Sequence, residues 1–141
     1  MSRKARAFAT MVAILATVVT GHAQPTTKVY RVAWVTPTPA AEDSVTLNAF
    51  RQELRQRGYV EGQNLTVEHR SVEAKPDQIS AVMAELIRRN VDVLVAVTQP
   101  TVQAAQQATR SIPIVMCGVG DPVATGLVAS LGRPGGNVTG I

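Results

Sequence analysis

The sequence is poor in the residues that build disulfide frameworks, metal centres and stacking surfaces. Its 141 residues include one cysteine, Cys117, and two histidines. A single cysteine excludes a disulfide framework and a cysteine-based zinc site, and two histidines are too few for a histidine-based one. Aromatic residues make up 4% of the chain, so no platform of rings is available for stacking on nucleic-acid bases.

Basic charge is also scarce beyond the first few residues. The chain holds 14 lysines and arginines against 10 acidic residues, but Arg3, Lys4 and Arg6 account for three of the 14. The other residues are therefore nearly balanced, with 11 basic side chains against 10 acidic ones. A nucleic-acid-binding protein needs a clustered basic surface to neutralise phosphates, so this balance argues against that class.

Residues 1–23 have the pattern of a secretory signal peptide. The basic residues precede an uncharged stretch at 7–20, and Gly21-His22-Ala23 supplies small residues for cleavage before Gln24. The alternative is a short membrane anchor, but this stretch falls short of the roughly 20 apolar residues that a spanning helix needs. We predict a cleaved leader at 1–23 and an exported lobe at 24–141 with no stable membrane insertion.

Apolar, β-branched runs alternate with helical patterns along the rest of the chain. The predicted strands are Lys28–Val35, Asn64–Val72, Val91–Thr98, Ile112–Val119 and Asn137–Ile141. The predicted helices are Glu42–Gly58, Pro76–Asn90, Thr101–Arg110 and Val123–Leu131. Strict alternation is typical of βαβ units, so we predict an α/β fold with a parallel sheet and helices on both faces.

Three loops follow strands of this sheet at the end where ligands bind. In open parallel sheets the ligand crevice lies beyond the carboxyl ends of the strands. The loops there are Thr36–Ser44, Thr98–Thr101 and Gly118–Pro122. They offer hydroxyls, amides and backbone N–H groups at the starts of helices, which suits carboxylate or phosphate groups.

Some residues of these loops also have a purely structural interpretation. Asp121 precedes a proline and is a good N-cap, and Thr98 or Thr101 could cap the third helix. Gly118 could serve a tight turn, although the close approach of a ligand needs the same absence of a side chain.

The sequence shows no recognisable arrangement of catalytic residues. Cys117 has no neighbouring base to activate it, and we expect it in the core at a strand end. His69 lies in an alternating strand beside charged residues and is expected on the surface. The sequence has no G-x-S-x-G elbow, no G-x-G-x-x-G after the first strand and no P-loop, so we predict ligand capture and no enzymatic activity.

Long blocks of the sequence resemble one family. Residues 50–65 match the pattern F-x-x-x-L-x-x-x-G-Y-x-E-G-x-N of ABC transporter substrate-binding proteins, the periplasmic type I group of tryptophan/tyrosine type. Residues 112–115, 120–131 and 133–140 also resemble this family, in the same order. The resemblance spans about residues 28 to 141.

The resemblance implies a fold and a role. The fold is a periplasmic-binding-protein-like type I lobe of three layers, with a sheet of order 2-1-3-4-5. Family members have two such lobes that close on a ligand, and this chain ends where the first, N-terminal lobe is complete. The implied role is the periplasmic capture of an amino acid or a related small organic compound for delivery to permease subunits in the inner membrane, with no cofactor and no metal.

The resemblance also implies a set of binding residues. Ligands of this family are held by loop residues at the strand ends. Carried over by position, these are Thr36, Pro37, Thr98, Gln99, Gly118 and Asp121.

Two other functional interpretations of the sequence stay open at this point. A small exported α/β enzyme would need a base or nucleophile at the strand ends, where only Cys117 and Asp121 come near. The effector-binding lobe of a transcription regulator would share the fold, but it is opposed by the leader and by the absence of DNA-binding helices.

Overall fold

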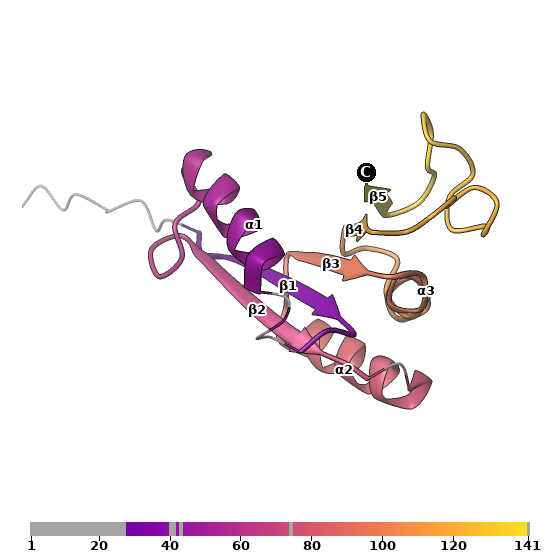
Figure 1. Ribbon diagram of the computed structural model, residues 1–141, viewed down its shortest axis with the longest axis horizontal. Helices are drawn as coiled ribbons and strands as arrows, with labels where there is room; N and C mark the ends of the chain where they lie inside the picture. Colours follow the sequence, from indigo (N-terminus) through magenta and orange to yellow (C-terminus); the bar gives the residue numbers. More distant parts are fainter. Residues whose placement is uncertain (1–27, 40–41, 43, 74, 141) are drawn as a thin grey trace, which may run out of the picture.

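The fold is a five-stranded parallel sheet in the predicted order. The computed structural model describes residues 28–39, 42, 44–73 and 75–140, so the leader and its cleavage site lie outside the described residues. The strands are β1 (Tyr30–Thr36), β2 (Leu65–Ser71), β3 (Val93–Val97), β4 (Ile114–Cys117) and β5 (Val138–Gly140). The order is β2-β1-β3-β4-β5, with β4 between β3 and β5 and all neighbours parallel, which confirms the prediction (Figure 1).

Three helices connect the strands. They are α1 (Ser44–Gln56), α2 (Pro76–Arg88) and α3 (Gln99–Ala108). Figure 1 shows α1 on one side of the sheet and α2 on the other, which gives the predicted three layers. Among the described residues, no helix is long and apolar enough to cross a membrane.

Side-chain alternation along the strands produces two apolar layers, because successive residues of a strand point to opposite faces. On one face, Val35, Ala96 and Met116 pack with buried residues of α2 and α3. On the other face, Trp34 and Val95 pack with α1. Central parallel strands are apolar on both faces for this reason.

The helices meet the sheet through stripes of apolar residues. In α2 the residues at i, i+4 and i+7, Ile79, Met83 and Leu86, are buried as the periodicity predicts. In α1, Leu47 is buried and Phe50 lies 5.0 Å from Trp34, ring centre to ring centre. Val45 was expected in the same stripe but is 80% exposed, so the buried stripe of α1 begins at Leu47.

The predicted helix Val123–Leu131 is wrong, because a single turn replaces it. Asp121 Oδ1 accepts hydrogen bonds from the N–H groups two and three residues on, at 3.0 and 2.9 Å, as a capping residue does, although only a turn follows it. Gly126 then adopts a φ of +73°, and the next two N–H groups bond back to the carbonyl of Pro122. This left-handed residue ends the turn and lets Leu127 and Val128 enter the core.

Two further expectations concern single residues. His69 is half-buried, opposite Trp34 in the register of β1 and β2 and thus on the face that α1 covers, so its placement on the surface is wrong. Cys117 is half-buried at the end of β4 and packs against the cluster under α1, as expected.

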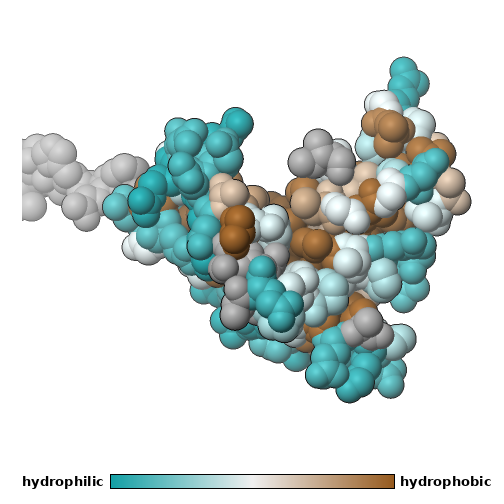
Figure 2. All heavy atoms as spheres, in the orientation of Figure 1, coloured by the Kyte–Doolittle hydropathy of each residue, from teal (hydrophilic) through white to brown (hydrophobic). Residues whose placement is uncertain are grey.

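The layer over β3 and β4 on the α1 side is thinner than the others. Figure 2 shows apolar residues gathered in a hollow between α1 and the C-terminal part of the chain, where these strands lie. Side chains that are only partly buried on this face of β3 and β4 include Val97, Val115 and Cys117. The lobe therefore leaves part of one sheet face thinly covered.

Candidate functional site

The carboxyl ends of β1, β3 and β4 lie at one edge of the sheet, because the three strands are parallel neighbours. Val97 pairs with Cys117 in the register of β3 and β4. The next residue, Thr98, donates its N–H to the carbonyl of Cys117 at 3.3 Å. The structure thus brings the predicted residues Thr98 and Gly118 side by side at this edge, with Thr36 at the end of the adjacent strand β1.

Thr36 is fully buried and its polar groups are used within the chain. Its Oγ1 accepts a hydrogen bond from the N–H of Thr38 at 3.2 Å, and its carbonyl accepts one from Val72 at 2.8 Å. These bonds fix the path of the chain as it leaves β1. Of the two predicted residues in this connection, only the half-buried Pro37 presents surface to a ligand.

Thr98 occupies the position before α3 in an unusual backbone conformation, with φ 110° and ψ 152°. Its side chain makes no capping bond, so the expectation that it caps α3 is wrong. Thr101 does not cap the helix either, since its fully buried hydroxyl donates to the carbonyl of Thr98 at 2.9 Å. Such strained residues cluster at ligand-binding sites in proteins generally.

Gly118 and Asp121 follow β4 at the same edge. Gly118 has a φ of +65°, and a Cβ placed there would lie 3.9 Å from Val97, an ordinary contact. The backbone conformation rather than crowding therefore favours glycine. Asp121 uses one carboxylate oxygen for its cap, and its other oxygen has no hydrogen-bond donor among the described residues.

The edge offers both donors and acceptors to a small molecule. The N–H groups of Gln99 and Thr101 belong to the first turn of α3 and have no intrahelical partner, and they carry the positive end of the helix dipole. The half-buried Gln99 adds a side-chain amide. The exposed carboxylate of Asp121 supplies negative charge. A zwitterion presents the complementary pair of charges.

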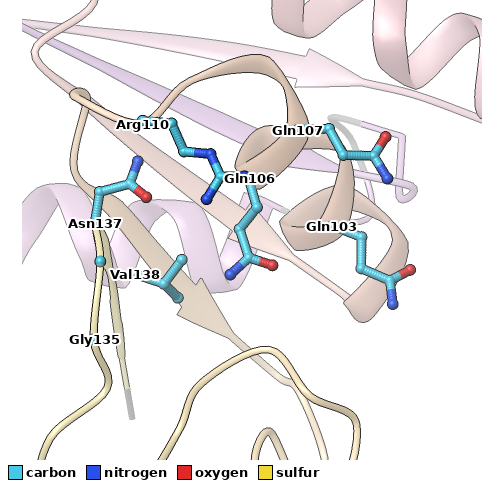
Figure 3. A pocket seen from close by; sticks show the side chains of 8 residues that line it. Gln103, Gln106, Gln107, Arg110, Gly135, Asn137 and Val138 are labelled. Atoms are coloured by element: carbon cyan, nitrogen blue, oxygen red, sulfur yellow. The ribbon is translucent and has the colours of Figure 1, made fainter.

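Two surface pockets among the described residues lie toward the other end of the strands. One, of about 440 Å³, lies between Gln103 and Gln106 of α3, Arg110 just after this helix, and the segment that leads into β5 (Figure 3). The other, of about 570 Å³, lies beside Arg51 and Arg55 of α1 and reaches the first residue of β2. Neither includes a predicted binding residue. The predicted residues Gly118 and Asp121 are exposed, so the expected site is an open wall.

The sequence blocks 58–65 and 133–140 have structural roles. Asn64 accepts the N–H of Val60 at 2.7 Å and donates to the carbonyl of Gly58 at 2.9 Å, which closes the turn before β2. Asn137 donates to the carbonyls of Thr109 and Ile112 at 3.2 and 2.7 Å. These asparagines hold loops at the amino ends of the strands, away from the candidate site.

Comparison with known proteins gives consistent matches. The family described as ABC transporter substrate binding protein matches residues 38–141. The tyrosine-binding protein of Clostridioides difficile is 36% identical over 91 residues, which cover 64% of this chain and 26% of that protein.

Solved structures match the same part of the chain. A conserved domain protein of Vibrio cholerae is 35% identical, with a TM-score of 0.73, over 80% of this chain and 38% of that one. A ligand-free, open substrate-binding protein with adhesive properties from Clostridium difficile is 28% identical, with a TM-score of 0.72, over 79% and 38%. The chain therefore spans between a quarter and two fifths of the length of these relatives.

Proposed function

The chain belongs to the ABC transporter substrate-binding protein family, and we propose that it forms the first lobe of an exported component that captures an amino acid for a permease. The observation that carries this proposal is the juxtaposition of Thr98, Gln99 and Gly118 at the carboxyl edge of the sheet, with Asp121 close behind in sequence. This is the edge at which open α/β sheets bind ligands.

The chemistry of this edge suits an amino acid. A ligand carboxylate would accept from the first-turn N–H groups of α3, and a ligand ammonium would lie near the free oxygen of Asp121. A relative that shares 36% of its residues over the matched part is named as a tyrosine-binding protein. Aromatic amino acids are therefore the first compounds to test.

The leader pattern and the family support a periplasmic location, where permease subunits of the inner membrane would receive the ligand.

A catalytic role has weaker support. The Cys117 thiol packs against apolar residues under α1, and one Asp121 oxygen is engaged in a cap, so neither group is poised beside a base.

The proposal is tested by nuclear magnetic resonance titration of the purified chain with L-tyrosine, L-phenylalanine and L-tryptophan. Expected are saturable shifts of the amide signals at 98–101 and 118–121. The variant Arg110→Ala, in the pocket at the opposite end of the strands, should titrate like the wild type. Shifts confined to residues around Arg110, or no saturable shifts with any amino acid, would refute the assigned site.

A further inference from the structure

We propose that the pocket between α3 and the segment before β5 is a second binding site, which takes a small oxyanion such as a carboxylate or phosphate group. The bound anion joins the end of α3 to the edge strand β5. This pocket lies at the amino ends of the strands, opposite the candidate amino-acid site, so the inference goes beyond the proposed function and does not depend on it.

The charge of the pocket favours an anion. Its volume of about 440 Å³ is in the range of small-molecule sites, and none of the described residues that line it is acidic. Its lining includes Arg110, whose guanidinium has no ion pair and no hydrogen bond among the described residues. A guanidinium binds carboxylate and phosphate oxygens through two parallel N–H bonds. The pocket therefore holds a cation that no neighbouring carboxylate neutralises.

The backbone of the same pocket adds further donors. Gly135 and Gly136 have positive φ angles, of 74° and 66°, and neither donates its N–H to another backbone group in the described part of the chain. A Cβ at either position would meet nothing within 4 Å, so the space beside this backbone is open. Successive free N–H groups in a turn form concavities that bind anions. These two groups are therefore available to the anion that Arg110 attracts.

Hydrogen bonds within the chain hold the walls of the pocket in place. The side-chain amide of Gln106 donates to the carbonyl of Leu127 at 2.8 Å. The side-chain amide of Asn137 is held by its two bonds to the loop between α3 and β4. Figure 3 shows the side chain of Arg110 between these two amides. The walls are thus fixed by the protein itself, and Arg110 is left free to bind a ligand.

Anion binding here has a structural consequence. The strand β5 is three residues long and, among the described strands, pairs only with β4. An anion held by Arg110 and by the backbone just before β5 links this edge strand to the end of α3. A ligand that binds only the closed form makes opening rarer, by a factor of about 11 when its concentration is ten times its Kd.

Nuclear magnetic resonance titration of the purified chain with sodium phosphate and with sodium succinate tests the site. The buffer contains neither phosphate nor carboxylates, and sodium chloride keeps the ionic strength constant. The proteins are the wild type, Arg110→Gln, Arg110→Lys and Arg133→Gln. Arg133 precedes the same glycines but does not line the pocket, so its variant is the matched control for the loss of one positive charge. Thermal melting without anion shows that each variant is folded.

The expected result is a set of saturable shifts of the amide signals at 110 and 135–138. Arg110→Gln should weaken binding at least about 10-fold, the scale of a hydrogen bond to a charged group. Arg110→Lys should weaken it less, because lysine keeps the charge but loses the paired N–H geometry. Arg133→Gln should bind within about twofold of the wild type, because salt screens a charge outside the pocket. Saturation by one anion alone assigns the site to that anion, and saturation by both assigns it to oxyanions in general.

Hydrogen exchange measures the link to β5. At ten times the measured Kd, deuterium exchange of the amides at 138–140 should slow about 10-fold in the wild type and stay unchanged in Arg110→Gln. Unchanged exchange in the wild type would overturn this link.

Two results of the titration would overturn the site itself. Shifts that grow linearly with both anions would show that neither binds specifically. Equal weakening by Arg110→Gln and Arg133→Gln would show a general attraction of anions to the basic surface. Both results leave the amino-acid titration at 98–101 and 118–121 unaffected, so the proposed function and this inference fail separately.

Discussion

At the scale of single residues, the backbone conformation of Thr98 sets stability against the ligand binding proposed for this residue. Its φ of 110° disfavours a β-branched side chain by about 1–3 kcal/mol, whereas glycine adopts such a conformation freely. We expect Thr98→Gly to raise the free energy of unfolding by about 1 kcal/mol, after the entropic cost of glycine, and to weaken amino-acid binding. Urea denaturation and the titration above measure the two effects.

Asn90 provides the matched control for this substitution. It is the other non-glycine residue with a positive φ among the described residues, at 54°, and it lies at the opposite end of the strands. Asparagine tolerates this region well, so Asn90→Gly should change stability little and binding not at all. A lower stability of Thr98→Gly than of the wild type would show that the surroundings of Thr98 do not strain it.

A second residue-scale prediction concerns pH. The ammonium of Lys28 lies 2.6 Å from Asp92 and, with the N–H of Arg31 at 2.8 Å, holds the pKa of that carboxyl below its ordinary value of 3.8. Because the folded pKa is the lower one, this stabilisation is present above about pH 3.8 and is lost as the pH falls through the folded pKa. The wild type and Asp92→Asn should therefore differ in stability near neutral pH, and their stabilities should converge below the folded pKa of Asp92.

The stabilising contribution of the same pair is also lost at alkaline pH. The hydrogen bond to Asp92 raises the pKa of Lys28 above 10.5, so its contribution persists below 10.5 and disappears as the pH rises through the folded pKa. Denaturation curves of Lys28→Met and of the wild type, measured from acid to alkaline pH, check the expected loss of stability at both ends of the range. Glu73→Gln, which removes an exposed local pair with Lys75, is the control that should show no comparable convergence.

At the scale of elements, the pairing of β4 with β5 depends on a glycine. Gly140 lies opposite Met116 in the register, and a Cβ at that position would overlap the carbonyl oxygen and the side chain of Met116. We expect Gly140→Ala to destabilise the lobe by about 1–3 kcal/mol, as other overpacked positions do. Gly120→Ala, where an added Cβ meets nothing within 4 Å, should be nearly neutral in the same urea denaturation.

Most elements could be predicted from local patterns, and the exceptions have physical causes. The alternation of β-branched runs and helical stripes predicted five strands and four helices, and the five strands and three of the helices form in the predicted order, because each pattern matches how the element is buried. The run Val123–Leu131 has good helix formers, but the left-handed Gly126 and the burial of Leu127 and Val128 override that local preference.

The candidate site was less predictable than the fold. The strand-end rule identified the loops, and their residues do gather at one edge. The sequence predicted a cap at Thr98 or Thr101, because threonine is common at the position before a helix. In the structure Thr98 has a positive φ and makes no capping bond, and the Thr101 hydroxyl donates to the carbonyl of Thr98.

At the scale of the whole molecule, affinity depends on how much of the ligand the lobe encloses. The candidate site is one open wall, whereas small-molecule sites typically bury 70–90% of their ligand. One wall supplies about half of that surface and still bears the cost of immobilising the ligand. We expect the chain alone to bind aromatic amino acids at least ~100-fold more weakly than a two-lobed protein that contains it, a loss of roughly 2.7 kcal/mol.

Calorimetry on two proteins checks this expectation. One is the chain itself, and the other joins residues 28–141 to the part of the tyrosine-binding relative that follows its matched region. Equal affinities for the same amino acid would mean that the single lobe is a complete binding module.

The thinly covered face of β3 and β4 near Val115 predicts, in addition, that the chain alone self-associates more than the joined protein does.

The single turn that replaces a helix after β4 also determines which part of the lobe opens first. The crossover at 118–137 is held by scattered local hydrogen bonds instead of a helical ladder, and Leu131 within it is 73% exposed. Its backbone N–H groups should exchange with deuterium through small local openings, long before those of β1 and β3, which exchange only when the sheet unfolds. β5 is reached through this crossover and, among the described strands, pairs only with β4, so we expect it to be the first strand that the sheet releases on this timescale.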